Sequence, residues 1–174
     1  MRTSSPCYIA APFFNYAQNN LLDKVESLFD SVGAYYFSPR KDADVVPAGA
    51  PMDEWQNAFD QNVRAIHVAE WMLAVLTYEL PEGLIATIVP KVVATPPDNL
   101  SPINIPDIGT VWEMGMAYAM NKPVVGYLPN KEALGTVNVM LARSMATIVI
   151  GINELMDTLH GNPPRRTVES ENMI

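Results

Sequence analysis

The stretch WMLAVL, residues 71–76, decides the fold, because six consecutive apolar residues predict a strand that is covered on both faces. Such strands are typical of parallel sheets with helices on either side. Four further short runs have the composition of strands, and all are rich in β-branched or aromatic residues: CYIAA (7–11), AYYFS (34–38), PVVGYL (123–128) and ATIVIG (146–151).

Helical patterns alternate with these five runs. They cover residues 16–33, 54–69 and 110–120, and a last helix begins at Asn153. In the second pattern Asp53 and Gln56 predict a capping box, and the apolar residues of one stripe are Trp55, Phe59, Val63 and Ile66. The alternation predicts an α/β fold, a flavodoxin-like doubly wound five-stranded parallel sheet with helices on both faces.

The length of 174 residues predicts a single domain, which we place at residues 1–160. A polar tail follows at residues 161–174. Residues 77–106 interrupt the alternation with six prolines, so we expect an irregular insertion there.

Charge and cysteine usage exclude several classes of function. A net charge of −8 makes nucleic acid and anionic membranes poor partners, because phosphates attract positive patches. A single cysteine, Cys7, excludes an internal disulfide and a cysteine-based zinc site, and His67 and His160 lack metal-ligand spacing. We therefore expect no cofactor. The N-terminus does not read as a signal peptide and no apolar run is long enough to span a membrane, so a cytoplasmic protein is expected.

The fold also predicts where a ligand binds. In open parallel sheets ligands bind beyond the carboxyl ends of the strands, at the switch in strand order. The segments on that side are 12–15, 38–40 and 130–138, together with the start of the helix at 110–120.

Two acids stand out in the segment PDIGTVWEMGMAYAM, residues 106–120, because Asp107 and Glu113 are its only charged residues. A buried carboxylate is costly, which favours a function for Glu113; the alternative is a first-turn glutamate that interacts with the helix dipole. For Asp107 the alternatives are an ordinary helix cap and a residue that holds substrate hydroxyls. The sequence alone does not decide between the two alternatives for either residue.

Three other positions have two readings each. Phe13 and Phe14, which follow the first strand, fit either a core and loop or the wall of a pocket for a flat ligand. Glu70, just before the strand at 71–76, fits a surface turn or a site residue.

The order of several motifs along the chain resembles the nucleoside 2-deoxyribosyltransferase family, from about Tyr8 to about Ile150. The segments that carry this resemblance are YIAAPFFNYAQ (8–18), SPR (38–40), NVRAI (62–66), AEWMLAVL (69–76), DIGTVWEMGMAYAMNKPVV (107–125) and NVM (138–140). The resemblance implies an enzyme that transfers the 2-deoxyribosyl group between nucleobases, with slow hydrolysis as a side reaction.

The resemblance also implies roles for individual residues. Glu113 is expected to attack C1′ and form a covalent deoxyribosyl intermediate, so that the configuration is retained. The other expected site residues are Tyr8, which orients Glu113; Asp107 and Asn138, which hold the sugar; Met140, which packs near the nucleophile; Phe13, which packs on the base; and Gln18 and Asn62, at further motif positions.

Two features depart from the family pattern. Glu70 stands where the family usually has an aspartate, and we expect it to exchange protons with the base. The insertion at 77–106 replaces a short connection and is interpreted as a lid or a subunit contact. The resemblance implies a homo-oligomer built from dimers, up to a hexamer, in which Asn138 comes from a neighbouring subunit.

Two alternatives to base exchange remain. One is an N-glycosidase of nucleoside 5′-monophosphates on the same fold, for which Arg40 would supply the phosphate contact. The other is a non-catalytic module that senses nucleosides. A carboxylate at position 107 disfavours a nearby phosphate.

Overall fold

The computed structural model describes residues 5–76, 106–130 and 138–162. It contains one five-stranded sheet in which every neighbouring pair is parallel, with the order β2-β1-β3-β4-β5. The predicted α/β, flavodoxin-like topology is therefore confirmed. The strands are β1 (Cys7–Ala10), β2 (Tyr36–Phe37), β3 (Trp71–Val75), β4 (Val124–Leu128) and β5 (Thr147–Ile150).

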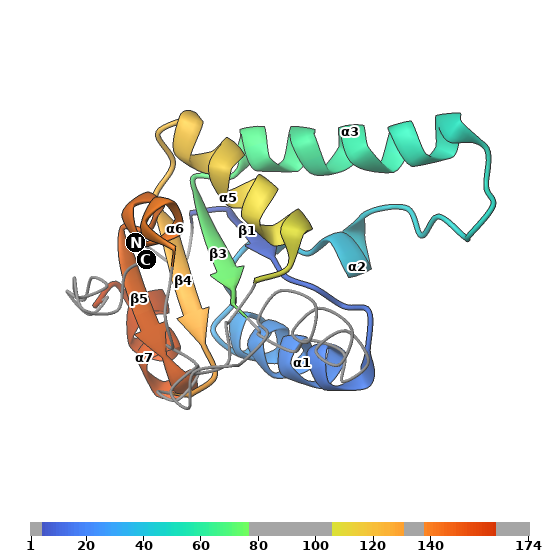
Figure 1. Cartoon of the computed structure of the whole chain (residues 1–174). Helices are drawn as coiled ribbons and strands as arrows, with labels where there is room; N and C mark the ends of the chain where they lie inside the picture. The colour runs from blue at the N-terminus through green and yellow to red at the C-terminus, as the bar shows by residue number, and fades with distance from the viewer. Residues whose placement is uncertain (1–4, 77–105, 131–137, 163–174) are drawn as a thin grey trace, which may run out of the picture.

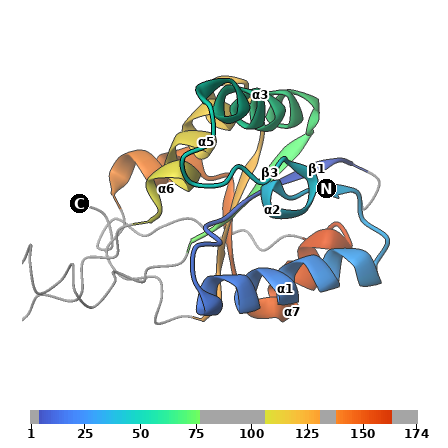
Figure 2. The ribbon, with the colours of Figure 1, turned by 90° about the vertical axis from the view of Figure 1, so that its right-hand side faces the viewer.

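Helices cover both faces of the sheet (Figure 1). In the described part of the chain they are α1 (Tyr16–Ser31), α2 (Pro39–Asp42), α3 (Met52–Val68), α5 (Ile108–Ala119), α6 (Val139–Ser144) and α7 (Gly151–Leu159). Figure 2 shows α3, α5 and α6 on one side of the sheet and α1 and α7 on the other.

Two apolar clusters lie on opposite faces of the sheet, because successive side chains of a strand point to opposite sides. In β1, Tyr8 belongs to the cluster under α3, α5 and α6, whereas Ile9 belongs to the cluster under α1 and α7. Met72 and Leu73 divide in the same way in β3, and both are almost fully buried. This division explains why residues 71–76 carry no polar position.

The observed strands are slightly shorter than the predicted runs, most of all β2. Only Tyr36 and Phe37 of the run 34–38 are in the sheet. The segment after β2, in which the sequence shows no helical pattern, begins with a short helix, since Pro39 stands at the first position of α2, where its fixed φ suits a helix.

The predicted capping box of α3 is wrong. The helix begins at Met52 after Pro51, which makes no side-chain cap, so Asp53 already lies in the first turn; the amide of Gln56 bonds the Asp60 carboxylate instead. The apolar stripe is also mostly outside the core, because α3 extends beyond the sheet (Figure 1). Ile66 is buried, whereas Trp55 and Phe59 are 45% and 46% exposed.

An ion pair ties α1 to the segment after β2. Glu26 of α1 is only 1% exposed, and Arg40 donates to both of its carboxylate oxygens, Nε to Oε1 at 2.9 Å and Nη2 to Oε2 at 2.6 Å. Ser38 Oγ donates to Oε1 at 2.6 Å and Lys41 Nζ lies 2.9 Å from Oε2. Burial alone would raise the pKa of Glu26, but these donors hold it below its ordinary value. The buried charge is therefore fully paired.

The insertion predicted at 77–106, except for Pro106, and the tail from residue 163 onward lie outside the described residues. The interpretation of the insertion as a lid or subunit contact stays a prediction. Within the described ranges, no helix combines the length and apolar character that crossing a membrane requires.

Candidate active site

Tyr8 and Glu113 form a direct hydrogen bond, although 105 residues separate them in the sequence. Tyr8 Oη donates to Glu113 Oε1 at 2.5 Å, a distance typical of a strong bond to a carboxylate. The Tyr8 ring is fully buried in β1 and stacks on Phe37 of β2, with 5.7 Å between ring centroids. Because both rings belong to the sheet, the hydroxyl is a fixed donor that orients the Glu113 carboxylate.

Asp107 forms the N-cap of α5. Its Oδ2 accepts from Thr110 N at 2.8 Å and from Thr110 Oγ1 at 3.1 Å. A Cβ at Gly109 would stand 3.0 Å from this oxygen, so glycine leaves room for the cap. Glu113 lies in the second turn of α5, which has no acid in its first turn. A first-turn dipole interaction therefore does not explain Glu113.

The environment of Glu113 shifts its titration toward neutral pH. Burial raises the pKa of this carboxyl from 4.5 to about 7; the hydrogen bond from Tyr8 opposes the shift and the negative charge of Asp107 adds to it. Burial and the nearby Glu113 raise the pKa of Tyr8, so its hydroxyl keeps its proton and remains a donor. The site thus holds a carboxyl group that exchanges a proton near neutral pH.

An exposed aromatic pair follows β1. Phe13 and Phe14 are 37% and 74% exposed and stack on each other, with 5.5 Å between ring centroids. Gln18 Oε1 accepts from Phe14 N at 2.8 Å, and Asn19 Nδ2 donates to Phe13 O at 2.9 Å. Gln18, expected to bind substrate, thus holds this turn in place. Asn19 was not singled out from the sequence, where it is one of two adjacent asparagines without a motif.

Asn62 has a buried carbonyl oxygen, Oδ1, with no hydrogen-bond partner in the described part of the chain. It lies on α3 between Phe59 and Ile66, at helical spacing. Phe59 contacts Trp112 of α5, with 5.3 Å between ring centroids, and Ile66 packs in the same cluster as Tyr8. Asn62 therefore faces the side of α3 that meets the sheet and α5. An unpaired buried acceptor of this kind is available to a donor from a ligand.

The structure does not bring Glu70 next to Glu113. Glu70 is exposed at the amino end of β3, where its backbone N–H donates to Pro6 O. Lys122, just beyond the end of α5, donates to backbone carbonyls of His67 and Ala69 beside it. Glu70 therefore lies at the edge of the sheet where α5 ends. Asp107 lies at the opposite edge, where α5 begins. The expected role of Glu70 toward the base stays a prediction.

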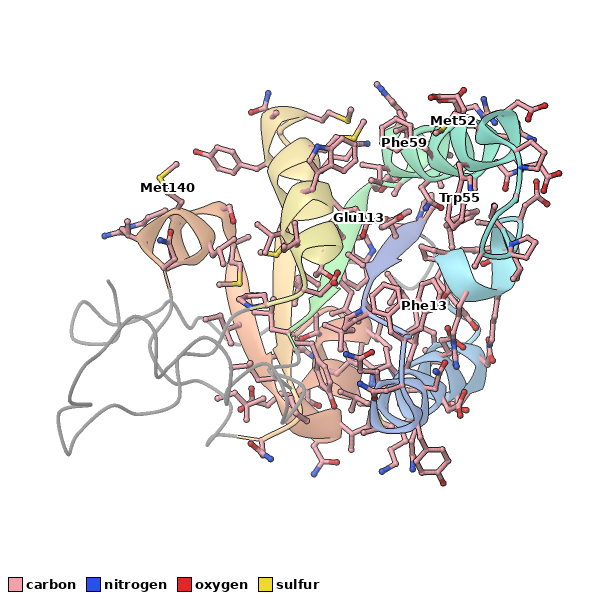
Figure 3. The ribbon with its side chains drawn as sticks, turned by 45° about the vertical axis from the view of Figure 1, so that its right-hand side comes forward. Phe13, Met52, Trp55, Phe59, Glu113 and Met140 are labelled. Atoms are coloured by element: carbon pink, nitrogen blue, oxygen red, sulfur yellow. The ribbon has the colours of Figure 1, made fainter. Side chains whose placement is uncertain are left out.

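Met140 also lies apart from Glu113 within one chain (Figure 3). Asn138 is the N-cap of α6, and its Oδ1 accepts from Met140 N at 2.9 Å. Met140 is exposed and points away from Glu113, whereas the labelled residues of α3 and Phe13 lie on the other side of α5 (Figure 3). Of the expected site residues, Tyr8, Asp107 and Glu113 lie close to one another within one chain. In the described ranges no group of three acidic, histidine or cysteine side chains is arranged to hold a metal ion.

A protein family model and several solved structures match this chain. A family model described as nucleoside 2-deoxyribosyltransferase matches residues 91–165, which include Asp107, Glu113 and Asn138. No curated protein sequence matches.

Two solved structures share the fold, and a third has a lower TM-score. A 2-deoxyribosyltransferase from Bacillus psychrosaccharolyticus is 19% identical with a TM-score of 0.70, covering 95% of this chain and 100% of the other. A conserved protein from Enterococcus faecalis is 16% identical with a TM-score of 0.60 (91% and 98% covered). A CMP N-glycosidase from Clostridium botulinum is 16% identical with a TM-score of 0.42 (88% and 96% covered).

The raised pKa of Glu113 predicts a pH-dependent effect on stability. Between its ordinary pKa of 4.5 and about 7, the folded protein holds a proton that the unfolded chain releases, so this group destabilises the fold as pH rises through that window. Glu113→Gln keeps an acceptor for Tyr8 without the charge. We expect it to unfold like the parent near pH 4.5 and to be about 3 kcal/mol more stable near pH 8. Urea unfolding across this range measures the difference.

The exposed glutamate Glu54 of α3 provides the control, since Glu54→Gln is expected to stay within about 0.5 kcal/mol of the parent. Parallel stability curves for Glu113→Gln and the parent would contradict the assigned titration.

Proposed function

The chain resembles the nucleoside 2-deoxyribosyltransferase family, whose model matches residues 91–165, and from this we propose that it transfers the 2-deoxyribosyl group of a 2′-deoxynucleoside to a second nucleobase. The observation that carries the proposal is the hydrogen bond from buried Tyr8 to Glu113, which fixes an acid of raised pKa beside the cap of α5.

The reaction proceeds in two displacements. The ionised Glu113 carboxylate forms a bond to C1′ while the glycosidic C–N bond breaks, and the departing base takes up a proton. A nitrogen of the second base then attacks C1′, releases the carboxylate and loses its proton. Two inversions at C1′ retain the configuration. Water in place of the second base gives slow hydrolysis.

The surroundings of Glu113 suit both displacements. The Tyr8 hydroxyl stabilises the ionised form and holds it in one direction, so that little reorganisation precedes attack. Glu113 is half-buried, which limits the access of water to the intermediate and favours attack by a base.

Asp107 is proposed to hold the sugar. Its Oδ2 forms the helix cap, which leaves Oδ1 as an acceptor for a sugar hydroxyl. The cap also fixes the carboxylate relative to Glu113, six residues further along the same helix. Helix cap and substrate contact are therefore compatible roles.

Phe13 and Asn62 are proposed to contact the base. Phe13 offers an exposed ring at the end of β1, on which a flat heterocycle can stack. Asn62 offers an unpaired buried oxygen that can accept from a ring or exocyclic N–H.

A second copy of the chain is proposed to complete the site. Met140 points away from Glu113 in its own subunit (Figure 3), and the expected roles of Asn138 and Met140 are assigned to a neighbouring subunit. The exposed side chains of α3 and α5, namely Met52, Trp55, Phe59 and Trp112, supply an apolar surface suited to such a contact (Figure 3).

The hydrogen bonds of Arg40 to protein groups favour an unphosphorylated donor over a nucleoside 5′-monophosphate. Every nitrogen of its guanidinium already donates to a protein group: Nε to Glu26, Nη1 to Asn19, and Nη2 to both Asp23 and Glu26. Only one N–H of Nη1 remains for a phosphate, and a bidentate contact would displace part of a buried ion pair, which is costly. Arg40 therefore does not support the N-glycosidase alternative.

Base exchange is tested by incubating the protein with thymidine and free adenine, or other such pairs, and separating the products by chromatography. We expect a new 2′-deoxynucleoside whose rate of formation rises to a plateau as pH passes through about 7. Glu113→Ala and Glu113→Gln should lower the rate by at least about 10³-fold. Asp157→Asn, on exposed α7, is the control. Nucleoside binding without exchange would favour the sensing module.

Comparing thymidine with its 5′-monophosphate as donors tests the phosphate argument. We expect the monophosphate to be poorer by at least about tenfold, because Asp107 repels it and Arg40 is occupied. Asp107→Asn, which keeps a capping oxygen, should narrow the gap. A preference for the monophosphate in the parent would support the N-glycosidase instead.

Assembly is tested by sedimentation velocity. The parent is expected to be an oligomer, and Trp55→Glu should shift it toward the monomer because a charge would enter the apolar contact. Asn57→Glu adds the same charge at an exposed position of α3 without removing an aromatic side chain. A monomeric parent, or equal behaviour of the two variants, would contradict the proposed interface.

A further inference from the structure

We propose that Arg40 and Asn19 act as positioning residues that hold the aromatic turn at Phe13 and Phe14 ready for the base. This inference rests on the proposed function, since it assigns the turn to base binding. It concerns a contact between the segments that follow β1 and β2, the two neighbouring strands at this edge of the sheet.

The side chain of Asn19 bridges the two segments. Its Oδ1 accepts from Arg40 Nη1 at 3.1 Å, and its Nδ2 donates to Phe13 O and Asn15 O, both at 2.9 Å. One orientation of the amide satisfies all three bonds, because Arg40 only donates and the two carbonyls only accept. Asn19 therefore transmits the position of Arg40 to the backbone of Phe13.

Arg40 is a rigid anchor for this contact. Its side chain is 14% exposed, and it is held by two bonds to the buried Glu26 and one to Asp23. Moving the guanidinium would leave the Glu26 charge buried without its main partner, which is strongly unfavourable. The fold therefore fixes the position of the Arg40 guanidinium, to which the Asn19 side chain is hydrogen-bonded.

The aromatic turn needs such support. The Phe14 side chain is mostly exposed, and more than a third of the Phe13 side chain is exposed. Neither residue belongs to the two apolar clusters of the core. Their order depends on each other and on the polar contacts of Gln18 and Asn19. A turn ordered in advance binds a flat base without the entropic cost of fixing it during binding.

The contact is separate from the machinery that attacks C1′. Tyr8 is held by β1 and by Phe37, and Glu113 by α5. Loosening the turn should therefore weaken base binding and leave the attack step and its pH dependence unchanged. A general loss of structure would change both.

Asn19→Asp and Asn20→Asp form a matched pair of variants. At position 19 the acid keeps an acceptor for Arg40 but replaces the N–H donor to Phe13 O with an oxygen, which the two carbonyls repel. Position 20 is exposed, in the next residue of α1, and receives the same change of charge. Both acids lie near the N-terminus of α1, where the helix dipole tolerates them.

Three measurements on the full-length protein separate the possible outcomes. They are the concentration of free adenine that half-saturates transfer, the rate of the first burst of base release with its pH midpoint, and amide hydrogen exchange across residues 13–19. For Asn19→Asp we expect about a tenfold higher half-saturating concentration, faster exchange, and a burst rate and pH midpoint within about twofold of the parent. Asn20→Asp should match the parent throughout.

Unchanged adenine saturation in Asn19→Asp, with or without faster exchange, would overturn the inference while base exchange by the parent still stands. A fall in the burst rate equal to the loss of base affinity would also overturn it, as a sign of general damage. If the parent transfers no deoxyribose, equilibrium binding of free adenine by calorimetry replaces the saturation measurement. A parent that binds no adenine would remove both proposals.

Discussion

The hydrogen bond between Tyr8 and Glu113 is the interaction on which the rest of the site depends. It places a carboxylate in a largely apolar environment and gives it one strong donor, so that the group is costly to ionise yet fixed when ionised. The fold supplies both partners from buried elements, namely strand β1, which lies between β2 and β3, and helix α5, which packs over it. The position of the acid is thus set by a strand and a helix of the fold, whereas the residues proposed to bind substrate, except Asn62 of α3, lie on turns and near helix ends.

Much of the fold follows from simple patterns in the sequence. The apolar run at 71–76 and the alternation of strands and helices predict the sheet and its order, because local periodicity and right-handed crossovers leave few other topologies. The start of α3 was not predictable in the same way. Asp53 and Gln56 match a capping pattern, but the helix starts two residues earlier, after Pro51, and the capping pattern alone does not decide between the two starts.

The candidate site, like the fold, is predictable from the sequence only in part. Family resemblance identifies Tyr8, Asp107 and Glu113, and the structure places these residues together. The contacts of Arg40 were beyond the reach of the sequence, since Arg40 follows β2 whereas Asn19 and Glu26 lie in α1, and no sequence motif links the two segments. Arg40 in SPR looked like a ligand for phosphate, and only its four bonds to protein groups assign it to structure. Long-range polar networks leave no periodic signal, so a single sequence does not reveal them.

The division of the core into two clusters has a practical consequence. Helix α7 packs on the face of the sheet opposite α3 and α5, and it carries none of the residues proposed for catalysis, base binding or subunit contact. Its outward side chains, such as Asn153 and Asp157, are therefore the natural place to attach a dye, an affinity handle or a solid support. A protein immobilised through this helix would present its candidate active site away from the support, because the sheet lies between α7 and that site.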